Sequence, residues 1–156
     1  MDSLTKEQRS WVMSRVRSKD TTPERIIRSF LYQQGFRFRL HEKNLPGSPD
    51  IVLPKYRTVI EIRGCFWHRH PGCKVAGMPL SNVDFWNAKF ERNVARDKRN
   101  EVAINNLGWN LIVVWGCQVR DKAILNRLPA RIKAGIFKTP KRVLDVKITS
   151  NNRLAE

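Results

Sequence analysis

Acidic residues are scarce in this sequence of 156 residues. Fourteen Asp and Glu stand against thirty Lys and Arg, which gives a formal net charge of +16. A charge of this size argues against a neutral soluble scaffold and points to a polyanionic partner, of which nucleic acid is the commonest. The basic residues are spread along the chain instead of gathering on one amphipathic segment, so a membrane surface is the weaker alternative.

Long apolar runs and paired cysteines are also lacking. No run of about 18 apolar residues occurs, and the first six residues carry no apolar signal segment, so we expect a cytoplasmic protein without a membrane partner. The three cysteines, Cys65, Cys73 and Cys117, are an odd number and cannot all pair within one chain. Thiols in a reducing compartment more often bind metal or do chemistry than form disulfides.

The remaining composition suits one folded unit. Hydrophobic residues make up 41% of the chain and aromatic residues 9%, which is enough for a core. We expect a monomer with a single domain over residues 1–136, whose first 20 residues form a basic helical segment. Residues 137–156 are polar and basic without a clear period, and we interpret them as a C-terminal tail.

Helical and strand patterns alternate along the chain, which predicts an α/β protein with a central mixed sheet covered by helices. Thr22 is expected to cap the second helix, and Pro129 to break or bend the last one. Segment 64–80, rich in Gly, Pro, Cys and His, is expected to be an irregular loop. Helices are predicted over residues 5–17, from 22 to before 35, over 81–107 and over 119–133, and strands over 36–40, 50–53, 57–63 and 109–115.

Two of the predicted strands form a hairpin, and each carries a carboxylate. Asp50 opens the first strand and Glu61 lies on its partner, so both side chains can converge at one end of the sheet. Two such oxygens hold a hard cation such as Mg²⁺, which can organise phosphodiester hydrolysis. The pattern is short, and a turn Asp with a solvent-exposed Glu is the alternative. The net charge and the further candidates Glu24 and His68 elsewhere in the chain favour the catalytic interpretation.

A second group of residues has the chemistry of a metal site. Cys65, His70 and Cys73 lie on one short loop, and Cys117 follows the strand predicted over residues 109–115. Three thiolates and one imidazole are a ligand set for tetrahedral zinc, and four protein ligands indicate a structural metal. The alternative is three buried thiols and a surface histidine. A loop so polar and so interrupted by Gly and Pro needs a crosslink, which favours the metal.

Large aromatic residues accompany this loop. Phe66 and Trp67 lie between the proposed zinc ligands, where exposed rings can act as a wedge in a base stack. Trp86 is a third candidate, for which core packing is an equal alternative, whereas Trp11, Trp109 and Trp115 are assigned to packing. His68 follows the aromatic pair and is not needed for zinc if His70 is the ligand, so it is a candidate general base.

Four motifs then give the chain a family resemblance. In order they are Leu45-Pro-Gly-Ser-Pro-Asp50, Gly64-Cys-Phe-Trp-His-Arg-His70, Asp84-Phe-Trp86 and Gly108-Trp-Asn110. Between about residues 6 and 119 the chain resembles the very short patch repair DNA mismatch endonucleases. This resemblance implies a restriction-endonuclease-like fold with a structural zinc. It also implies an enzyme that nicks one strand beside the thymine of a T:G mismatch, the product of 5-methylcytosine deamination.

The resemblance assigns roles to individual residues. Asp50 becomes the principal Mg²⁺ ligand, His68 the base that activates water, and Glu24 a residue that holds water near the active site. The zinc ligands are Cys65, His70, Cys73 and Cys117, and the aromatic wedge is Phe66, Trp67 and Trp86.

At Glu61 and Arg63 the chain departs from the family pattern. This acidic and basic pair is typical of general PD-(D/E)xK nucleases, which makes Glu61 a catalytic candidate and Arg63 a candidate DNA contact. The backbone carbonyl of Ile62 is a further candidate Mg²⁺ ligand.

The expected partner is therefore double-stranded DNA with a T:G mismatch, together with mismatch-repair proteins. One alternative keeps the fold and makes the protein a restriction-type or repair DNase that cuts both strands. A second alternative is a non-catalytic zinc-stabilised DNA-binding module, which would leave Asp50, Glu61 and His68 without a task.

Overall fold

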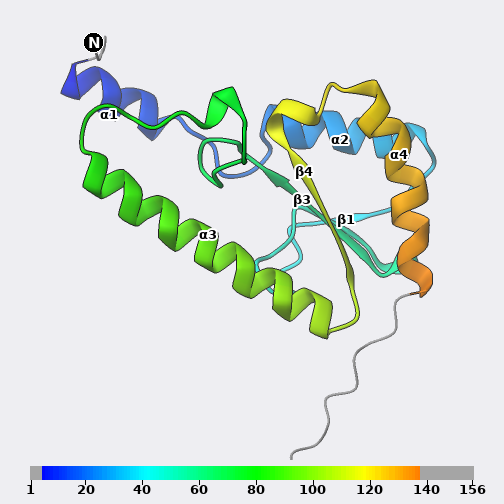
Figure 1. Ribbon diagram of the computed structural model, residues 1–156. Coiled ribbons are helices and arrows are strands. Elements are labelled where there is room, and N and C mark those ends of the chain that lie inside the picture. Colours follow the sequence, from blue (N-terminus) through cyan, green and yellow to red (C-terminus); the bar gives the residue numbers. More distant parts are fainter. Residues whose placement is uncertain (1–4, 138–156) are drawn as a thin grey trace, which may run out of the picture.

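A four-stranded mixed sheet forms the centre of the protein, as expected from the alternation of elements (Figure 1). The computed structural model describes residues 5–137. In spatial order the strands are β1 (Arg39–Leu40), β2 (Ile51–Leu53), β3 (Thr58–Arg63) and β4 (Asn110–Trp115). The pairs β1–β2 and β2–β3 are antiparallel, and β3–β4 is parallel. The predicted hairpin is thereby confirmed, with the 3₁₀ turn Pro54–Tyr56 between its strands.

Helices cover both faces of this sheet. Helix α3 (Val83–Asn106) runs along one face, while α2 (Thr22–Gln33) and α4 (Lys122–Lys133) cover the other (Figure 1). Helix α1 (Lys6–Ser14) projects away from the sheet and its covering helices. Three more 3₁₀ turns, Lys74–Ala76, Gly116–Gln118 and Ala134–Phe137, complete the described elements.

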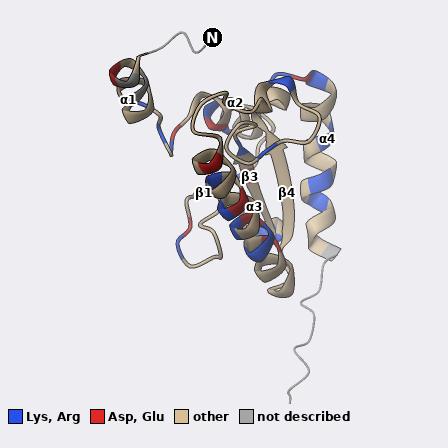
Figure 2. Ribbon diagram, turned by 60° about the vertical axis from the view of Figure 1, so that its left-hand side comes forward, with Lys and Arg blue, Asp and Glu red and all other residues tan. Residues whose placement is uncertain are grey.

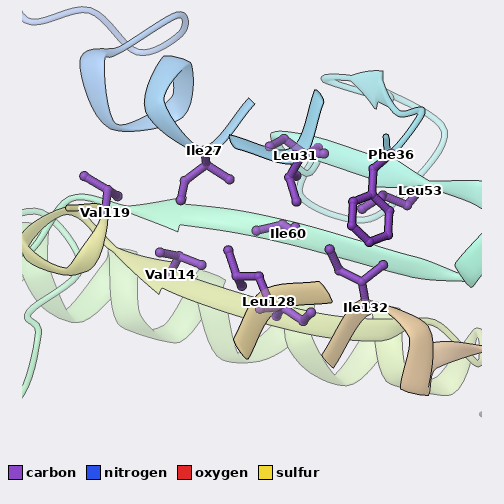
Figure 3. Packing of buried hydrophobic residues seen from close by; sticks show 11 residues of the cluster. Ile27, Leu31, Phe36, Leu53, Ile60, Val114, Val119, Leu128 and Ile132 are labelled. Atoms are coloured by element: carbon purple, nitrogen blue, oxygen red, sulfur yellow. The ribbon is translucent and has the colours of Figure 1, made fainter. Parts of the chain in front are cut away.

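Alternate residues of the strands supply two separate cores, because successive side chains of a strand point to opposite faces. Ile60 of β3 packs with Ile27 of α2 and Leu128 of α4 in the larger core (Figure 3). Its neighbour Val59 points the other way and packs with Ile104 of α3. Burial on both faces fixes the register of β3, since a shift by one residue would exchange the two faces.

Several helix boundaries differ from the sequence prediction: α1 ends at Ser14 instead of residue 17, and α3 begins at Val83 instead of residue 81. Thr21, one residue before the predicted Thr22, caps α2 through a capping box with Glu24. Helix α4 begins at Lys122 because the side chain of Asp121 accepts hydrogen bonds from the amides of Ala123 and Ile124. It then continues through Pro129 to Lys133, so this proline does not end the helix.

The strand predicted over residues 36–40 is shorter than expected. Gly35 ends α2 with φ +80°, and the amide of Phe36 donates to the carbonyl of Leu31, which closes a Schellman-type turn. Phe36 is therefore engaged with the helix end, and only Arg39 and Leu40 pair with β2.

The assignment of Trp11 to packing is wrong. This side chain is 55% exposed on α1, and the guanidinium of Arg15 lies 3.8 Å from its ring centroid. Trp109 does pack against the smaller core, and Trp115 stacks on His70. The sequence pattern could not separate these cases because α1 has too few neighbours to bury a ring.

Basic side chains recur along α3 and α4, and on α3 they are interspersed with acidic ones (Figure 2). Between residues 5 and 137, no helix is long and apolar enough to cross a membrane. The predicted tail falls almost wholly on residues 138–156, which lie outside the described part of the chain.

Candidate active site and metal centre

A cavity of about 670 Å³ lies where the hairpin, the loop after β3 and the helices α2 and α3 meet. Its lining includes Glu24 from α2, Asp50 and Glu61 from the hairpin, and His68 from the loop. The four residues predicted to be catalytic are therefore brought to one place. The cavity also contains residues predicted for other roles: Ile62, Arg63 and Trp67.

Asp50 is the carboxylate most strongly shaped by its surroundings. It directly precedes β2, and its Oδ2 accepts a hydrogen bond of 2.7 Å from the amide of Ile62 on β3. Burial raises the pKa of Asp50 to about 6, and the hydrogen bond from the Ile62 amide opposes this rise. The nearby charge of Glu24 raises the pKa further. A poorly solvated carboxylate that is costly to ionise alone is suited to a cation.

His68 has a partner that sequence reasoning missed. Its Nδ1 lies 2.5 Å from Oδ2 of Asp97 on α3. Burial opposes ionisation of Asp97, but the hydrogen bond and the charge of His68 outweigh it and lower the pKa of this carboxyl. When His68 is neutral, an ionised Asp97 accepts the proton of its Nδ1, and Nε2 is then the acceptor nitrogen of the ring. No motif linked residues that are 29 positions apart, and only the placement of α3 brings them together.

Glu24 is 3% exposed and is held on several sides. It closes the capping box with Thr21, its Oε2 accepts from the amide of Asp20, and Arg28 donates to the same oxygen over 2.7 Å. One ligand-type atom each of Asp20, Glu24 and His41 lies within 4.8 Å of the others, a spacing at which such atoms could hold a metal ion. The guanidinium of Arg28 contacts all three and supplies the positive charge within the cluster.

Glu61 and Arg63 contact each other. Nε and Nη2 of Arg63 both donate to Oε2 of Glu61, and Nη1 donates to Oε1 of Glu101 on α3 over 2.6 Å. Arg63 is 7% exposed. In this arrangement it ties β3 to α3 through the protein's own carboxylates instead of offering free donors to DNA. The roles of Glu61 as a metal ligand and Arg63 as a DNA contact stay predictions, and their contacts support an anchoring function.

The four residues of the predicted zinc site form one cluster. The ligand atoms of Cys65, His70, Cys73 and Cys117 all lie within 4.8 Å of one another. Nδ1 of His70 is 3.7 Å from the sulfur of Cys65 and 3.4 Å from that of Cys117. With metal bonds of about 2.3 Å to sulfur and 2.0 Å to nitrogen, a tetrahedral zinc site spaces such atoms by roughly 3.5 Å. The donor set and its spacing therefore fit one tetrahedral metal ion.

The parallel pairing explains how distant cysteines meet. Arg63 pairs with Trp115, so Cys65 and Cys117 follow two adjacent strands at the same distance beyond the pair. The ring of His70 stacks on Trp115 at 4.2 Å, which orients its Nδ1 toward the sulfurs. Partial desolvation and the neighbouring thiols Cys65 and Cys73 raise the pKa of Cys117 to about 11. A bound cation would offset this mutual repulsion of thiolates.

The three candidate wedge residues pack together beside this cluster. Phe66 contacts Trp67 and Trp86 edge to face, with ring centroids 5.1 and 5.3 Å apart. Trp86 is 7% exposed and also stacks on Phe90 of α3. Trp67 lines the active-site cavity, and Nζ of Lys89 lies 5.1 Å from its ring. Phe66 and Trp67 are thus partly buried members of an aromatic cluster next to the predicted catalytic residues.

Comparison with known proteins gives consistent matches. The family model described as DNA mismatch endonuclease Vsr matches residues 1–74. The type II nicking enzyme V.XorIIP of Xanthomonas oryzae pv. oryzae is 48% identical over 132 residues, which cover 85% of this chain and 94% of that protein. The type II nicking enzyme V.NmeAIP of Neisseria meningitidis is 46% identical over 139 residues, with coverage of 86% and 99%.

A third relative bears the name of the family itself. The DNA mismatch endonuclease Vsr of Escherichia coli is 39% identical over 133 residues, which cover 81% of this chain and 85% of that protein. The motifs, the cavity and the Cys/His cluster are all found within the described residues. The chain belongs to the Vsr family of DNA mismatch endonucleases.

Proposed function

We propose that this DNA endonuclease nicks one strand of a duplex beside the thymine of a T:G mismatch, in a reaction that depends on Mg²⁺. Its active site is the cavity that holds Asp50, His68 and Glu24 on a restriction-endonuclease-like core. The observation that carries the proposal is the His68–Asp97 pair facing the same cavity as Asp50. A base and a carboxylate for a cation are the two elements that metal-assisted phosphodiester hydrolysis requires.

The residues of the cavity have different roles in the proposed hydrolysis. Asp50 would hold Mg²⁺, with the Ile62 carbonyl as a further candidate ligand, and the ion when bound polarises the phosphate and offsets charge on the leaving oxygen. Nε2 of His68 accepts the proton of the attacking water, while Asp97 holds the imidazole in the required tautomer. Glu24, fixed by Thr21 and Arg28, would orient water in the same cavity as Asp50.

For the Cys/His cluster we propose zinc as the metal. Three sulfurs and one imidazole nitrogen are soft donors, and four protein ligands leave no open position for chemistry. The metal would hold the loop that carries Phe66, Trp67 and His68, so its role is structural.

For selectivity we propose that the aromatic cluster of Phe66, Trp67 and Trp86 enters the base stack at the mismatch. A T:G wobble stacks less well than a Watson–Crick pair, so opening the stack beside it costs less free energy. The basic residues of α3 and α4 (Figure 2), most of which are exposed, would supply attraction to phosphates that does not depend on sequence.

Cleavage of matched and mismatched duplexes tests this proposal. Duplexes of one sequence with T:G or C:G at the central pair, and a supercoiled plasmid, are incubated with and without added Mg²⁺. The expected result is a single nick on the thymine strand of the T:G duplex, only with Mg²⁺, and no reaction by Asp50→Ala. Linear plasmid from cuts in both strands would favour the restriction-type alternative, and binding without cleavage the DNA-binding module.

A further inference from the structure

Arg28 and His41 lie beside the proposed catalytic carboxylates, and apart from the contact of Arg28 with Glu24 neither has a role in the proposed reaction. Nη1 of Arg28 donates to Asp20 over 2.5 Å, and Nη2 donates to Glu24 over 2.7 Å. The same Nη2 lies 3.0 Å from Nε2 of His41. The Arg28 side chain is 14% exposed, and its contacts with Glu24 and His41 are largely shielded from water, whereas the side chain of Asp20 is 64% exposed.

The contact between Arg28 and His41 determines which nitrogen of the His41 ring carries the proton. A guanidinium has only donors, so Nε2 of His41 must be the acceptor and the ring proton must be on Nδ1. That Nδ1 faces Oδ1 of Asp50 at 3.9 Å. The second oxygen of Asp50 already accepts from the Ile62 amide. The Ile62 amide of β3 thus holds one oxygen of Asp50. The other oxygen faces Nδ1 of His41, and the contact of Arg28 with Nε2 places the ring proton on that nitrogen.

Sheet pairing brings His41 to this place. Leu40 pairs with Ile51, so the next antiparallel position sets His41 opposite Asp50, and the His41 amide lies 3.4 Å from the Asp50 carbonyl. His41 has φ +49°, a left-handed conformation that is costly for a residue other than glycine. Asp20, the other end of the Arg28 contact set, has φ +55°. Strained backbone of this kind persists where its surroundings fix it, and it is commonest at functional sites.

A second cost accompanies this arrangement. Nε of Arg28 is buried and has no hydrogen-bond partner among the residues that the structure describes. A buried donor without a partner lowers stability. The guanidinium therefore adopts a position that favours its contacts with Asp20, Glu24 and His41 over satisfaction of all its donors.

We propose that Arg28 is a positioning residue of the active site, which fixes Glu24 directly and orients Asp50 through the Nδ1–H tautomer of His41. This inference rests on the proposed function, since it assigns work to residues behind the proposed metal ligand. Outer contacts of metal ligands typically contribute about 10–100-fold in metal affinity or activity. Arg28→Met should therefore lower the single-turnover nicking rate by about 10–100-fold and raise the Mg²⁺ concentration for half-maximal rate, with DNA affinity in the absence of Mg²⁺ unchanged.

Substitutions at His41 separate positioning from folding. Gly and Asn both tolerate a positive φ, so neither strains the backbone further. Asn can place an amide N–H where Nδ1–H stands, whereas Gly removes it. We expect His41→Asn to retain most of the rate, and His41→Gly to lose about 10-fold or more at a melting temperature no lower than that of the wild type. The control Arg25→Lys changes an exposed arginine of the same helix and should leave rate and Mg²⁺ dependence unchanged.

An NMR measurement tests the inference without relying on nicking activity. Long-range ¹H–¹⁵N spectra of the wild type at pH 8 should show His41 as the Nδ1–H tautomer, and Arg28→Met should abolish this preference. An Nε2–H tautomer, or His41→Gly nicking as fast as the wild type, would overturn the positioning role. So would an Arg28→Met variant that loses only DNA affinity. A wild-type protein that never nicks would refute the proposed function, while the tautomer would still test this inference.

Discussion

Replacing Asp50 by Asn is expected to abolish nicking and at the same time to stabilise the folded protein. Burial raises the pKa of Asp50 from 3.8 to about 6, so near neutral pH its charge is less favourable in the native state than in the unfolded chain. The difference of about 2 pKa units corresponds to about 3 kcal/mol at pH 7.5. Asn carries no charge, and its carbonyl oxygen can still accept from the Ile62 amide.

The stability difference between Asp50→Asn and the wild type should grow as the pH rises. A carboxyl group whose pKa is raised on folding favours the native state at low pH, and that contribution is lost as the pH rises from about 4 through about 6. Asp50→Asn should therefore exceed the wild type by at most about 3 kcal/mol at pH 7.5 and by only about 1 kcal/mol at pH 4.5. Urea unfolding in Mg²⁺-free buffer without chelator measures both values.

A control and a ligand titration complete the experiment. Glu91→Gln removes one charge from an exposed position of α3 and should change the free energy of unfolding by less than about 0.5 kcal/mol at either pH. Added Mg²⁺ should stabilise the wild type and leave Asp50→Asn unaffected, because a ligand stabilises only the state that binds it. A variant less stable than the wild type at pH 7.5, or a difference that does not change with pH, would refute the reasoning.

Four further predictions follow from the same geometry. Cys117→Ser should lose the bound metal and the cooperative melting transition, because structural zinc contributes directly to folding; one zinc per folded variant chain by elemental analysis would contradict this. Asp97→Asn should lower the single-turnover nicking rate by up to about 10²–10⁴-fold at unchanged DNA affinity, and an unchanged rate would remove His68 from the role of base. Glu61→Gln weakens one of the two carboxylate contacts of Arg63, so the free energy of unfolding should fall by about 1–3 kcal/mol, while the Mg²⁺ concentration needed for nicking stays the same. A higher Mg²⁺ concentration would instead support Glu61 as a metal ligand. Trp67→Ala should reduce the preference for mismatched over matched duplex while the salt dependence of binding stays the same, and the opposite pair of results would assign Trp67 to packing alone.

Local signals in the sequence were sufficient for the hairpin and for the Cys/His cluster. The turn around Pro54 and its β-branched flanks predict antiparallel pairing, which sets Asp50 across from the end of β3. Three of the four cluster residues lie within nine positions of one another, and Cys117 follows a strand whose apolar run is easily recognised. For the hairpin and for three of the four cluster residues, the chemistry and the spacing are found within one short segment.

Contacts that depend on tertiary placement could not be predicted in this way. Asp97 meets His68 only because α3 crosses the sheet at a particular angle and rotation, and its sequence neighbours are as charged as it is. His41 meets Asp50 through a pairing of β1 and β2 that covers two residues of each strand. Trp11 shows the converse error, since an apolar period predicts a buried face only where another element covers it.

The order of the Cys/His cluster along the chain has a consequence for synthesis in the cell. Cys65, His70 and Cys73 leave the ribosome together, and Cys117 follows 44 residues later, just after β4. At about 5–20 residues per second this interval lasts roughly 2–9 s, during which the fourth residue of the cluster has not yet been synthesised. Cys117 arrives only with the strand that β3 needs as its parallel partner, so closure of the cluster coincides with completion of the sheet. A nascent chain stalled within this interval would expose two thiols and an unpaired strand edge, which makes it a target for oxidation and aggregation.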